Sequence, residues 1–319
     1  APLQHKTGQR DGGQTEEEFS RGIVEYLMFL ESMVSSDDAS AQKLAAEALC
    51  LLSAALIEKG FQVNISLLEQ LFWDRDTAES VGEHIPAVYA ALIQRKLMSA
   101  DQLKEKLADP DQHISDAAVE ALAMVFVRDI EAGTRPDLSL IEKAAYPTSV
   151  YLRNAPLCAL ARCYAAMIKH GMAVDFSVLN DMLRTATPSL QNSIIRITKD
   201  LYAAALAAGH DVDLSALEET IDCKNDPSIR VSTEALEALT GAYEVLLDQG
   251  KPVKRSLLKS LLTHSEHPVR RRSTAAIGLV CLSDARQGKE TDLSDLRAML
   301  ADSDFSVCSA ASEALAEIY

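Results

Sequence analysis

The sequence lacks several features that would each point to a particular class of protein. Glycine and proline number only 13 and 10 among 319 residues, which is too few for a fibrous or low-complexity chain. No unbroken run of about 18 apolar residues occurs, and the longest comparable stretch extends only from Ala48 to Ile57. The first 20 residues contain no apolar core of a secretory signal. We therefore predict neither a membrane span nor a secretory signal in this sequence.

Positive charge is also scarce. The chain has 31 Lys and Arg residues against 47 Asp and Glu residues, so its net charge is −16. A general nucleic-acid binder is disfavoured because phosphate contacts require clustered basic residues. The hydrophobic share of 48% is too high for a disordered chain. Composition thus indicates a folded, acidic protein.

Cysteine pairs at metal-binding or redox spacing are absent, since no CxxC occurs. A chain of this length also needs no disulfide framework. We predict a reducing, cytoplasmic location, with most cysteines serving as small core residues of helices. The six cysteines are Cys50, Cys158, Cys163, Cys223, Cys281 and Cys308.

Catalytic motifs are missing too, because the chain contains no GxSxG, no P-loop and no GxGxxG following a strand. His264 and His267, with Glu266 between them, could approach one ion, but they lie at a proline turn and no third ligand is evident. We therefore expect no catalytic residue, no cofactor and no metal.

A repeated phrase is what the sequence does contain. A glycine is followed by a segment such as Asp213-Leu214-Ser215 and then by apolar residues, as happens after Gly209. Successive copies are separated by 35, 38, 38, 38, 41 and 38 residues, so one supersecondary unit recurs seven times. The anchors of the seven copies are Ser66, Asp101, Ser139, Ser177, Ser215, Ser256 and Ser294.

Each copy predicts a long helix, a turn and a short helix. The glycine suits the left-handed residue that closes a helix, and the following Asp, Asn or Ser can cap the next one. Proline then marks the turn into the next long helix. Pro86 and Pro156 fall where long helices are expected and predict a kink or a delayed start. Three capping boxes are also predicted: Ser66 with Glu69, Ser139 with Glu142, and Ser215 with Glu218.

This pattern resembles the HEAT-like repeat family. The matching segments are Asp226-Pro227-Ser228-Ile229-Arg230, His267-Pro268-Val269-Arg270 and Asp304-Phe305-Ser306-Val307. The resemblance covers residues 38–319 and implies an all-α, right-handed α-solenoid of seven to eight helical hairpins without a β-sheet. Residues 1–14 are predicted to be a polar tail, and residues 15–35 a capping helix that begins the 15–319 solenoid. The chain has no initiator Met, and we expect a fragment or a processed form.

A local cluster of basic residues interrupts the acidic chain, with Glu266 as its single acid. One interpretation is a docking patch for an acidic partner, a phosphate group or a nucleic-acid backbone. The other is a solvated edge whose charges pair with acids such as Glu234 and Glu237. We call Lys251, Lys254, Arg255, Lys259, Arg270, Arg271 and Arg272 the basic cluster.

Aromatic residues recur at the repeat spacing, each seven residues before a closing glycine. This column consists of Phe126, Tyr164, Tyr202 and Tyr243. The tyrosines are either possible interface residues on a binding face or a repeated core position. Trp73, after a predicted short helix, is either a local core residue or an exposed anchor for a partner.

A large repeated surface without site chemistry favours a non-catalytic scaffold or adaptor that binds another protein. The alternative is a HEAT-like nucleic-acid-binding or nucleic-acid-processing protein that uses the basic cluster at 251–272. A chromophore-handling HEAT-like protein is a third, weaker interpretation. The sequence alone does not identify the partner or the oligomeric state.

Overall fold

The computed structural model describes residues 12–61, 63–73, 82, 84–146, 154–222 and 229–319. Every regular element in these residues is a helix, which confirms the all-α prediction. The chain divides into two compact units, Ala1–Val125 and Phe126–Tyr319. We call them unit 1 and unit 2 and describe each by itself.

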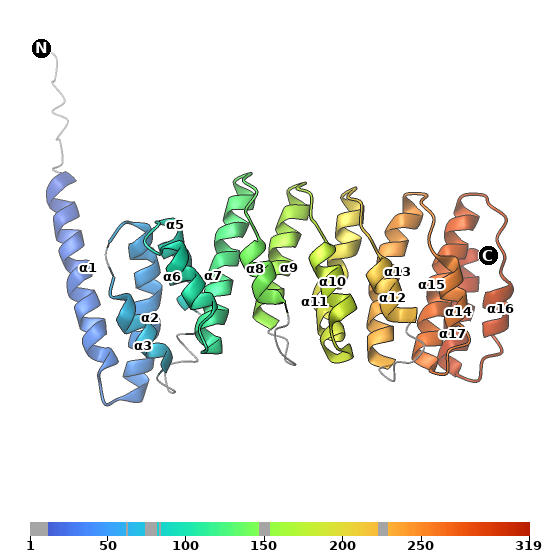
Figure 1. Ribbon diagram of the computed structural model, residues 1–319, viewed down its shortest axis with the longest axis horizontal. Coiled ribbons are helices and arrows are strands. Elements are labelled where there is room, and N and C mark those ends of the chain that lie inside the picture. Colours follow the sequence, from blue (N-terminus) through green and yellow to red (C-terminus); the bar gives the residue numbers. More distant parts are fainter. Residues whose placement is uncertain (1–11, 62, 74–81, 83, 147–153, 223–228) are drawn as a thin grey trace, which may run out of the picture. The chain divides into compact units, whose positions relative to one another are not determined.

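Unit 1 is built around helix α2, which packs against α1, α3 and α5. Asp38 caps α2 by accepting hydrogen bonds from the backbone N–H groups of Ser40 and Ala41. The buried face of α2 includes Leu49 and Leu56, so its apolar stripe forms the core of this unit. The helices of unit 1 (Figure 1) are α1 (Gly12–Val34), α2 (Ala39–Glu58), α3 (Ile65–Trp73), α5 (Ile85–Gln94), α6 (Ala100–Leu107) and most of α7 (Gln112–Glu131).

Helix α2 is also the one helix in the described residues that is long and apolar enough to cross a membrane. The expectation of no such segment rested on unbroken apolar runs, and Glu47 interrupts this one. A core helix of a soluble protein passes the same test of length and composition. Within unit 1, α2 packs against three neighbouring helices.

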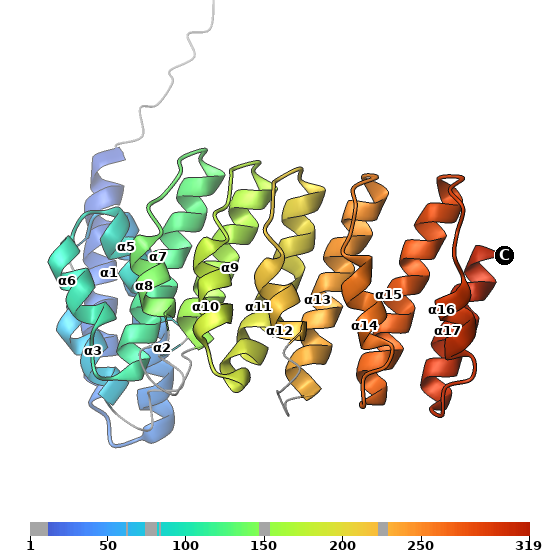
Figure 2. The same cartoon turned by 45° about the vertical axis from the view of Figure 1, so that its right-hand side comes forward.

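Unit 2 consists of helix pairs stacked in two layers (Figures 1 and 2). Each short helix packs against the long helix that follows it, and each long helix packs against the next long helix. This stacking of equivalent pairs is an α-solenoid. The pairs are α8 (Ser139–Ala145) with α9 (Asn154–Lys169), α10 (Ser177–Thr185) with α11 (Pro188–Ala207), α12 (Ser215–Asp222) with α13 (Ile229–Asp248), α14 (Arg255–Leu261) with α15 (His267–Arg286), and α16 (Ser294–Met299) with α17 (Phe305–Ile318).

The core of unit 2 lies between the two layers. Leu179, Leu217 and Leu258 of the short helices are fully buried, as are Leu160 and Leu239 of the long helices. A single helix pair cannot bury these side chains unaided, so stacking supplies the apolar contacts that stabilise each repeat.

Two prolines, Pro86 and Pro156, fall where the sequence predicts long helices. Helix α5 begins at Ile85 and carries Pro86 in its first turn. Pro156 is the third residue of α9. For α5 this confirms the expected delayed start, because proline is tolerated where the N–H group has no intrahelical partner.

The turn that closes each long helix places one residue in the left-handed region. Gly60, Gly133 and the other four glycines of the repeated phrase have φ values between 68° and 91°. In the remaining repeat this place is taken by Lys96, with φ of 56°, and it is the one non-glycine residue with positive φ in the described ranges. The sequence pattern missed this turn because it relied on glycine.

We expect Lys96→Gly to raise the free energy of unfolding by about 0.5–1 kcal/mol, because a left-handed conformation is strained for a residue with a Cβ atom. The midpoint of thermal unfolding followed by circular dichroism measures the change. The reverse substitution, Gly133→Lys, serves as the control and should lower stability by a similar amount. A Lys96→Gly protein no more stable than the parent would contradict this account.

Candidate partner-binding surface

The basic cluster is spread over three segments of unit 2. Lys251 lies in the loop after α13, Lys254 and Arg255 lie at the start of α14, and Arg270 lies in the first turn of α15. Lys259 follows on α14, and Arg271 and Arg272 follow Arg270 on α15. The sequence is right that neighbouring repeats contribute these residues, but their partners decide what they do.

Short-helix cations of the cluster form ion pairs with other helices. The Lys254 ammonium lies 3.0 Å from a Glu218 carboxylate oxygen of α12. Arg255 pairs with Asp284 of α15. The Lys259 ammonium lies 2.6 Å from Asp295 of α16, and the hydrogen bond to Asp295 raises the pKa of Lys259 above its ordinary value. These charges therefore connect α14 to elements on both sides of it.

Arg270 makes the most complete set of contacts in the cluster. Its guanidinium donates to both carboxylate oxygens of Asp302, at 2.8 and 2.9 Å, and to the backbone carbonyls of His264 and Ser265 at 2.9 Å. Both side chains of the ion pair are largely covered, with 13% and 8% of their surfaces exposed. The guanidinium lowers the pKa of Asp302 to about 2.

For most members of the basic cluster, the contacts favour the second interpretation, in which the charges pair with nearby acids. Arg272 lies 2.7 Å from Glu237 of α13, so five of the seven cations have a carboxylate partner. A cation held by a carboxylate attracts a second anion weakly. Lys251 and Arg271 alone have no ionic partner within the described residues. The cluster is therefore mainly a set of links between repeats, and Glu237 is one of the acids that the sequence proposed for that role.

The tyrosine column belongs to the core. Tyr164, Tyr202 and Tyr243 expose at most 3% of their surfaces. Their hydroxyls donate to Glu142, Asn180 and Glu218 at 3.2, 3.3 and 2.7 Å. The interpretation as interface residues is therefore wrong for these three residues, because each ring fills the space between a short helix and the following long helix. Burial and the neighbouring carboxylates raise the pKa values of Tyr164 and Tyr243.

The same arrangement occurs in unit 1, where the Tyr89 hydroxyl donates to Glu69 at 3.0 Å. The sequence pattern missed Tyr89 because it counted back from glycine, and the closing residue of that repeat is Lys96. Phe126 of α7, which lacks a hydroxyl, is half-buried. The column therefore fixes the register between the two helices of a repeat.

The predicted capping boxes are wrong, because Ser66, Ser139 and Ser215 lie inside their helices and are not N-cap residues. The paired glutamates accept hydrogen bonds from the tyrosine hydroxyls. Instead, an aspartate two residues before the anchor serine accepts from the serine N–H, as Asp213 does from Ser215 at 2.9 Å. This hydrogen bond holds the pKa of Asp213 below its ordinary value. The sequence correctly named these aspartates as candidate caps. The same contact is made by Asp137, Asp175 and Asp292.

Within the described residues, the remaining candidates form no further site. Trp73 ends α3, and its side chain lies outside the described residues. His264 accepts a hydrogen bond from the Glu266 N–H at 3.1 Å, and His267 lies 3.4 Å from Asp304. No group of three or more His, Cys, Asp or Glu side chains in the described ranges is arranged to hold a metal ion. Of the cysteines, Cys223 lies outside these ranges, and Cys50, Cys281 and Cys308 are free thiols.

The outward face of the long helices remains as a regular surface of unit 2. In each long helix, one position lies six residues before the position of the aromatic column. It is occupied by Cys158 on α9, Arg196 on α11, Glu237 on α13 and Ala275 on α15. The first, second and fourth are exposed and Glu237 is half-buried. One turn later stand Arg162, Asp200, Gly241 and Leu279. We call these eight residues the long-helix face.

An ionic chain runs along one edge of the long-helix face. Lys199 of α11 lies 3.2 Å from one carboxylate oxygen of Glu237, and Arg272 of α15 lies 2.7 Å from the other. Three successive long helices are thus tied to one another at the surface. All three side chains are at least one-third exposed, so the energy of each pair is small.

Comparisons with known proteins give limited information. No family model and no curated protein matches the chain. Among solved structures, it is similar to a designed armadillo repeat protein in complex with the peptide (KR)4, with 20% identity, coverage of 68% of this chain and 98% of that chain, and a TM-score of 0.44. A second designed armadillo repeat protein matches with 20% identity, 69% and 100% coverage, and a TM-score of 0.42. An engineered protein covers 92% of this chain, with 96% of its own length, 17% identity and a TM-score of 0.30. At these TM-scores the likenesses assign no function.

Proposed function

We propose that the chain is a HEAT-like, non-catalytic scaffold that binds a partner protein along the long-helix face of unit 2. The supporting observation is the contrast between two sets of equivalent positions. The positions that hold a repeat together carry nearly the same residue each time, such as the buried tyrosines and the capping aspartates. At the exposed position, Cys158, Arg196, Glu237 and Ala275 share no chemistry.

This contrast separates folding from recognition. A position that served only to stabilise a repeat would face the same packing demands in every copy and would favour one residue type. The exposed side chains of Arg196 and Ala275 face no such demand, so they are available to specify a partner. A row of different side chains on rigid helices is a surface suited to a protein, because it presents several separate contact points.

The turn between α14 and α15 supports the HEAT-like assignment. The segment His267-Pro268-Val269-Arg270 begins α15, and Arg270 crosses to Asp302 in the turn before α17. An arginine in the Pro-Val-Arg segment of one repeat thus joins the turn of the next repeat. This link gives the sequence resemblance a structural role, namely fixing the angle between neighbouring repeats.

Site-directed photo-crosslinking tests the scaffold proposal. A photoreactive residue placed at Arg196 or at Ala275 should form an adduct with the same discrete protein of a native lysate, and excess unlabelled chain should compete. The matched control carries the photoreactive residue at Ser177, which is exposed on short helix α10. Equal adducts from all three positions would count against a specific surface, and substrate turnover by the purified chain alone would contradict the non-catalytic assignment.

The nucleic-acid alternative loses its main support because five of the seven cations have carboxylate partners. Filter binding at two salt concentrations separates the two functions. The scaffold proposal expects little retention of DNA or RNA at either concentration. Strong retention that falls steeply with salt, and that is lost when Arg270, Arg271 and Arg272 become alanine, would favour the alternative.

A further inference from the structure

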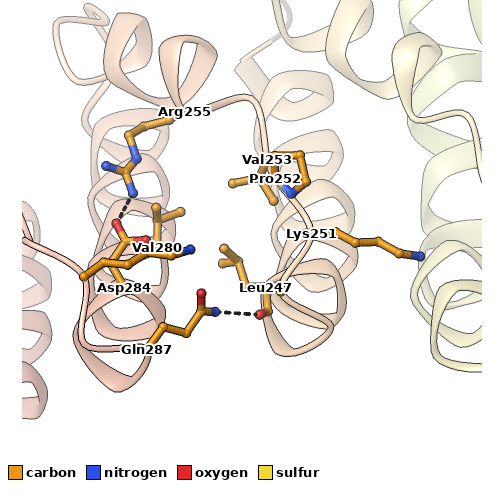
Figure 3. Close-up of a pocket in the computed structure, with 10 residues that line it drawn as sticks. Leu247, Lys251, Pro252, Val253, Arg255, Val280, Asp284 and Gln287 are labelled. Carbon is orange, nitrogen blue, oxygen red and sulfur yellow. Dashed lines mark hydrogen bonds and ion pairs between the residues drawn. The ribbon is translucent and has the colours of Figure 1, made fainter.

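A small pocket in unit 2 opens between the end of α13 and the end of α15. Its volume is about 300 Å³, and Leu247, Pro252, Val253 and Val280 form its apolar lining. Leu247 of α13 and Val280 of α15 face the space from opposite sides (Figure 3). A volume of this size accommodates a large apolar side chain, at the lower end of the range of ligand pockets.

The pocket coincides with an exception to the repeat. The residue before the anchor serine is Leu138, Phe176 or Leu214 in three other repeats of unit 2, and each of these exposes at most 8% of its surface. In the fourth repeat the same position, before Ser256, is Arg255. Arginine does not fill the apolar space that a leucine or phenylalanine would occupy there, so the layer between two long helices is left underfilled.

Polar contacts keep the arginine at the edge of this space. The Arg255 guanidinium bonds to the Asp284 carboxylate (Figure 3), and 38% of the arginine side chain is exposed. On the opposite edge, the Gln287 amide donates to the Leu247 carbonyl oxygen at 3.3 Å. The second contact reaches the neighbouring helix pair, and together the two contacts frame an opening with an apolar floor.

The charge around the opening is positive although the chain is acidic. Arg255 and Lys289 line the pocket with Asp284 as the single acid, and Lys251 is also part of the lining. The Lys251 side chain points away from the pocket (Figure 3), so it adds charge beside the opening. Neither lysine has an ionic partner in the part of the chain that the structure describes. The local field therefore attracts a carboxylate.

We propose that this pocket binds a segment of a partner protein in which a leucine or phenylalanine is flanked by acidic residues. The apolar side chain enters the place that the other repeats fill with their own leucine or phenylalanine. The flanking carboxylates contact Lys289 at the edge of the opening. This inference rests on the proposed function, because it supplies one anchor point for the partner that the scaffold binds.

Selection from a display library of random short peptides tests the proposal while the partner protein is still unidentified. Peptides selected on the parent chain should be enriched in leucine or phenylalanine next to Asp or Glu. Arg255→Leu restores the buried residue of the other repeats and fills the pocket, and Lys289→Glu reverses the charge at its edge. Each variant should weaken binding of the selected peptides by about tenfold or more.

The matched control is Lys259→Leu, which removes a cation from the same helix but outside the pocket, and it should change affinity less than about twofold. Circular dichroism melts verify that all three variants fold. The proposal would be overturned by selected peptides that lack the acidic-apolar pattern. It would also be overturned by peptides that bind the Arg255→Leu variant as tightly as the parent chain. If crosslinking from Arg196 and Ala275 persists in Arg255→Leu, failure of the pocket leaves the scaffold proposal intact.

Discussion

Replacing Gly278 with alanine should lower the free energy of unfolding by about 1–3 kcal/mol. Gly278 lies in the middle of α15, and a Cβ atom at this position would lie 2.5 Å from the Cβ atom of Ala314 on α17. Real Cβ atoms do not approach so closely, so the two helices would have to separate and lose part of their contact. Chemical denaturation followed by circular dichroism measures the loss.

Two comparisons isolate the close approach as the cause. Gly241 is a second helical glycine, on α13, and a Cβ atom there meets nothing within 4 Å. Gly241→Ala should therefore raise stability by about 0.5–1 kcal/mol, because alanine favours the helix. The double variant Gly278→Ala with Ala314→Gly removes the opposing Cβ atom and should recover most of the loss. A Gly278→Ala protein that behaves like Gly241→Ala would show that α15 and α17 are not in close contact.

The repeat could be predicted because its signals are local. A closing glycine, an aspartate two residues before a serine, and a proline in the next turn lie within one repeat and follow from backbone chemistry. The same reliance on local signals explains the failure at Lys96, where the turn retains its left-handed geometry without glycine. Gly278 drew no attention because its role depends on Ala314, a residue of the next long helix.

The candidate site was harder to predict because its basic side chains form ion pairs with acidic residues of other helices. The sequence shows seven basic residues within a short segment, but Glu218, Asp284, Asp295 and Asp302 reach them from other helices. A count of charge along the chain cannot pair residues that stacking brings together. The tyrosines were misread for a related reason, since amphipathic side chains suit both an interface and a core position with a polar partner.

Replacing Arg270 with alanine should lower the free energy of unfolding by about 2–3 kcal/mol at neutral pH, because the covered Asp302 carboxylate loses both of its guanidinium hydrogen bonds. The carbonyls of His264 and Ser265 lose a donor at the same time. The neighbouring Arg271 has no ionic partner in the described residues, so Arg271→Ala is the matched control and should change stability by less than about 0.5 kcal/mol.

The dependence on pH distinguishes the ion pair from simple loss of packing. In the folded chain the pKa of Asp302 is about 2, below the value near 3.9 for an unfolded aspartate. The carboxylate therefore contributes its full stabilisation above about pH 4 and loses it as the pH falls toward 2. The stability difference between the parent and Arg270→Ala should shrink over the same interval when urea unfolding is measured at successive pH values. A difference that stays constant from pH 6 to pH 2 would assign the effect to packing of the arginine side chain instead.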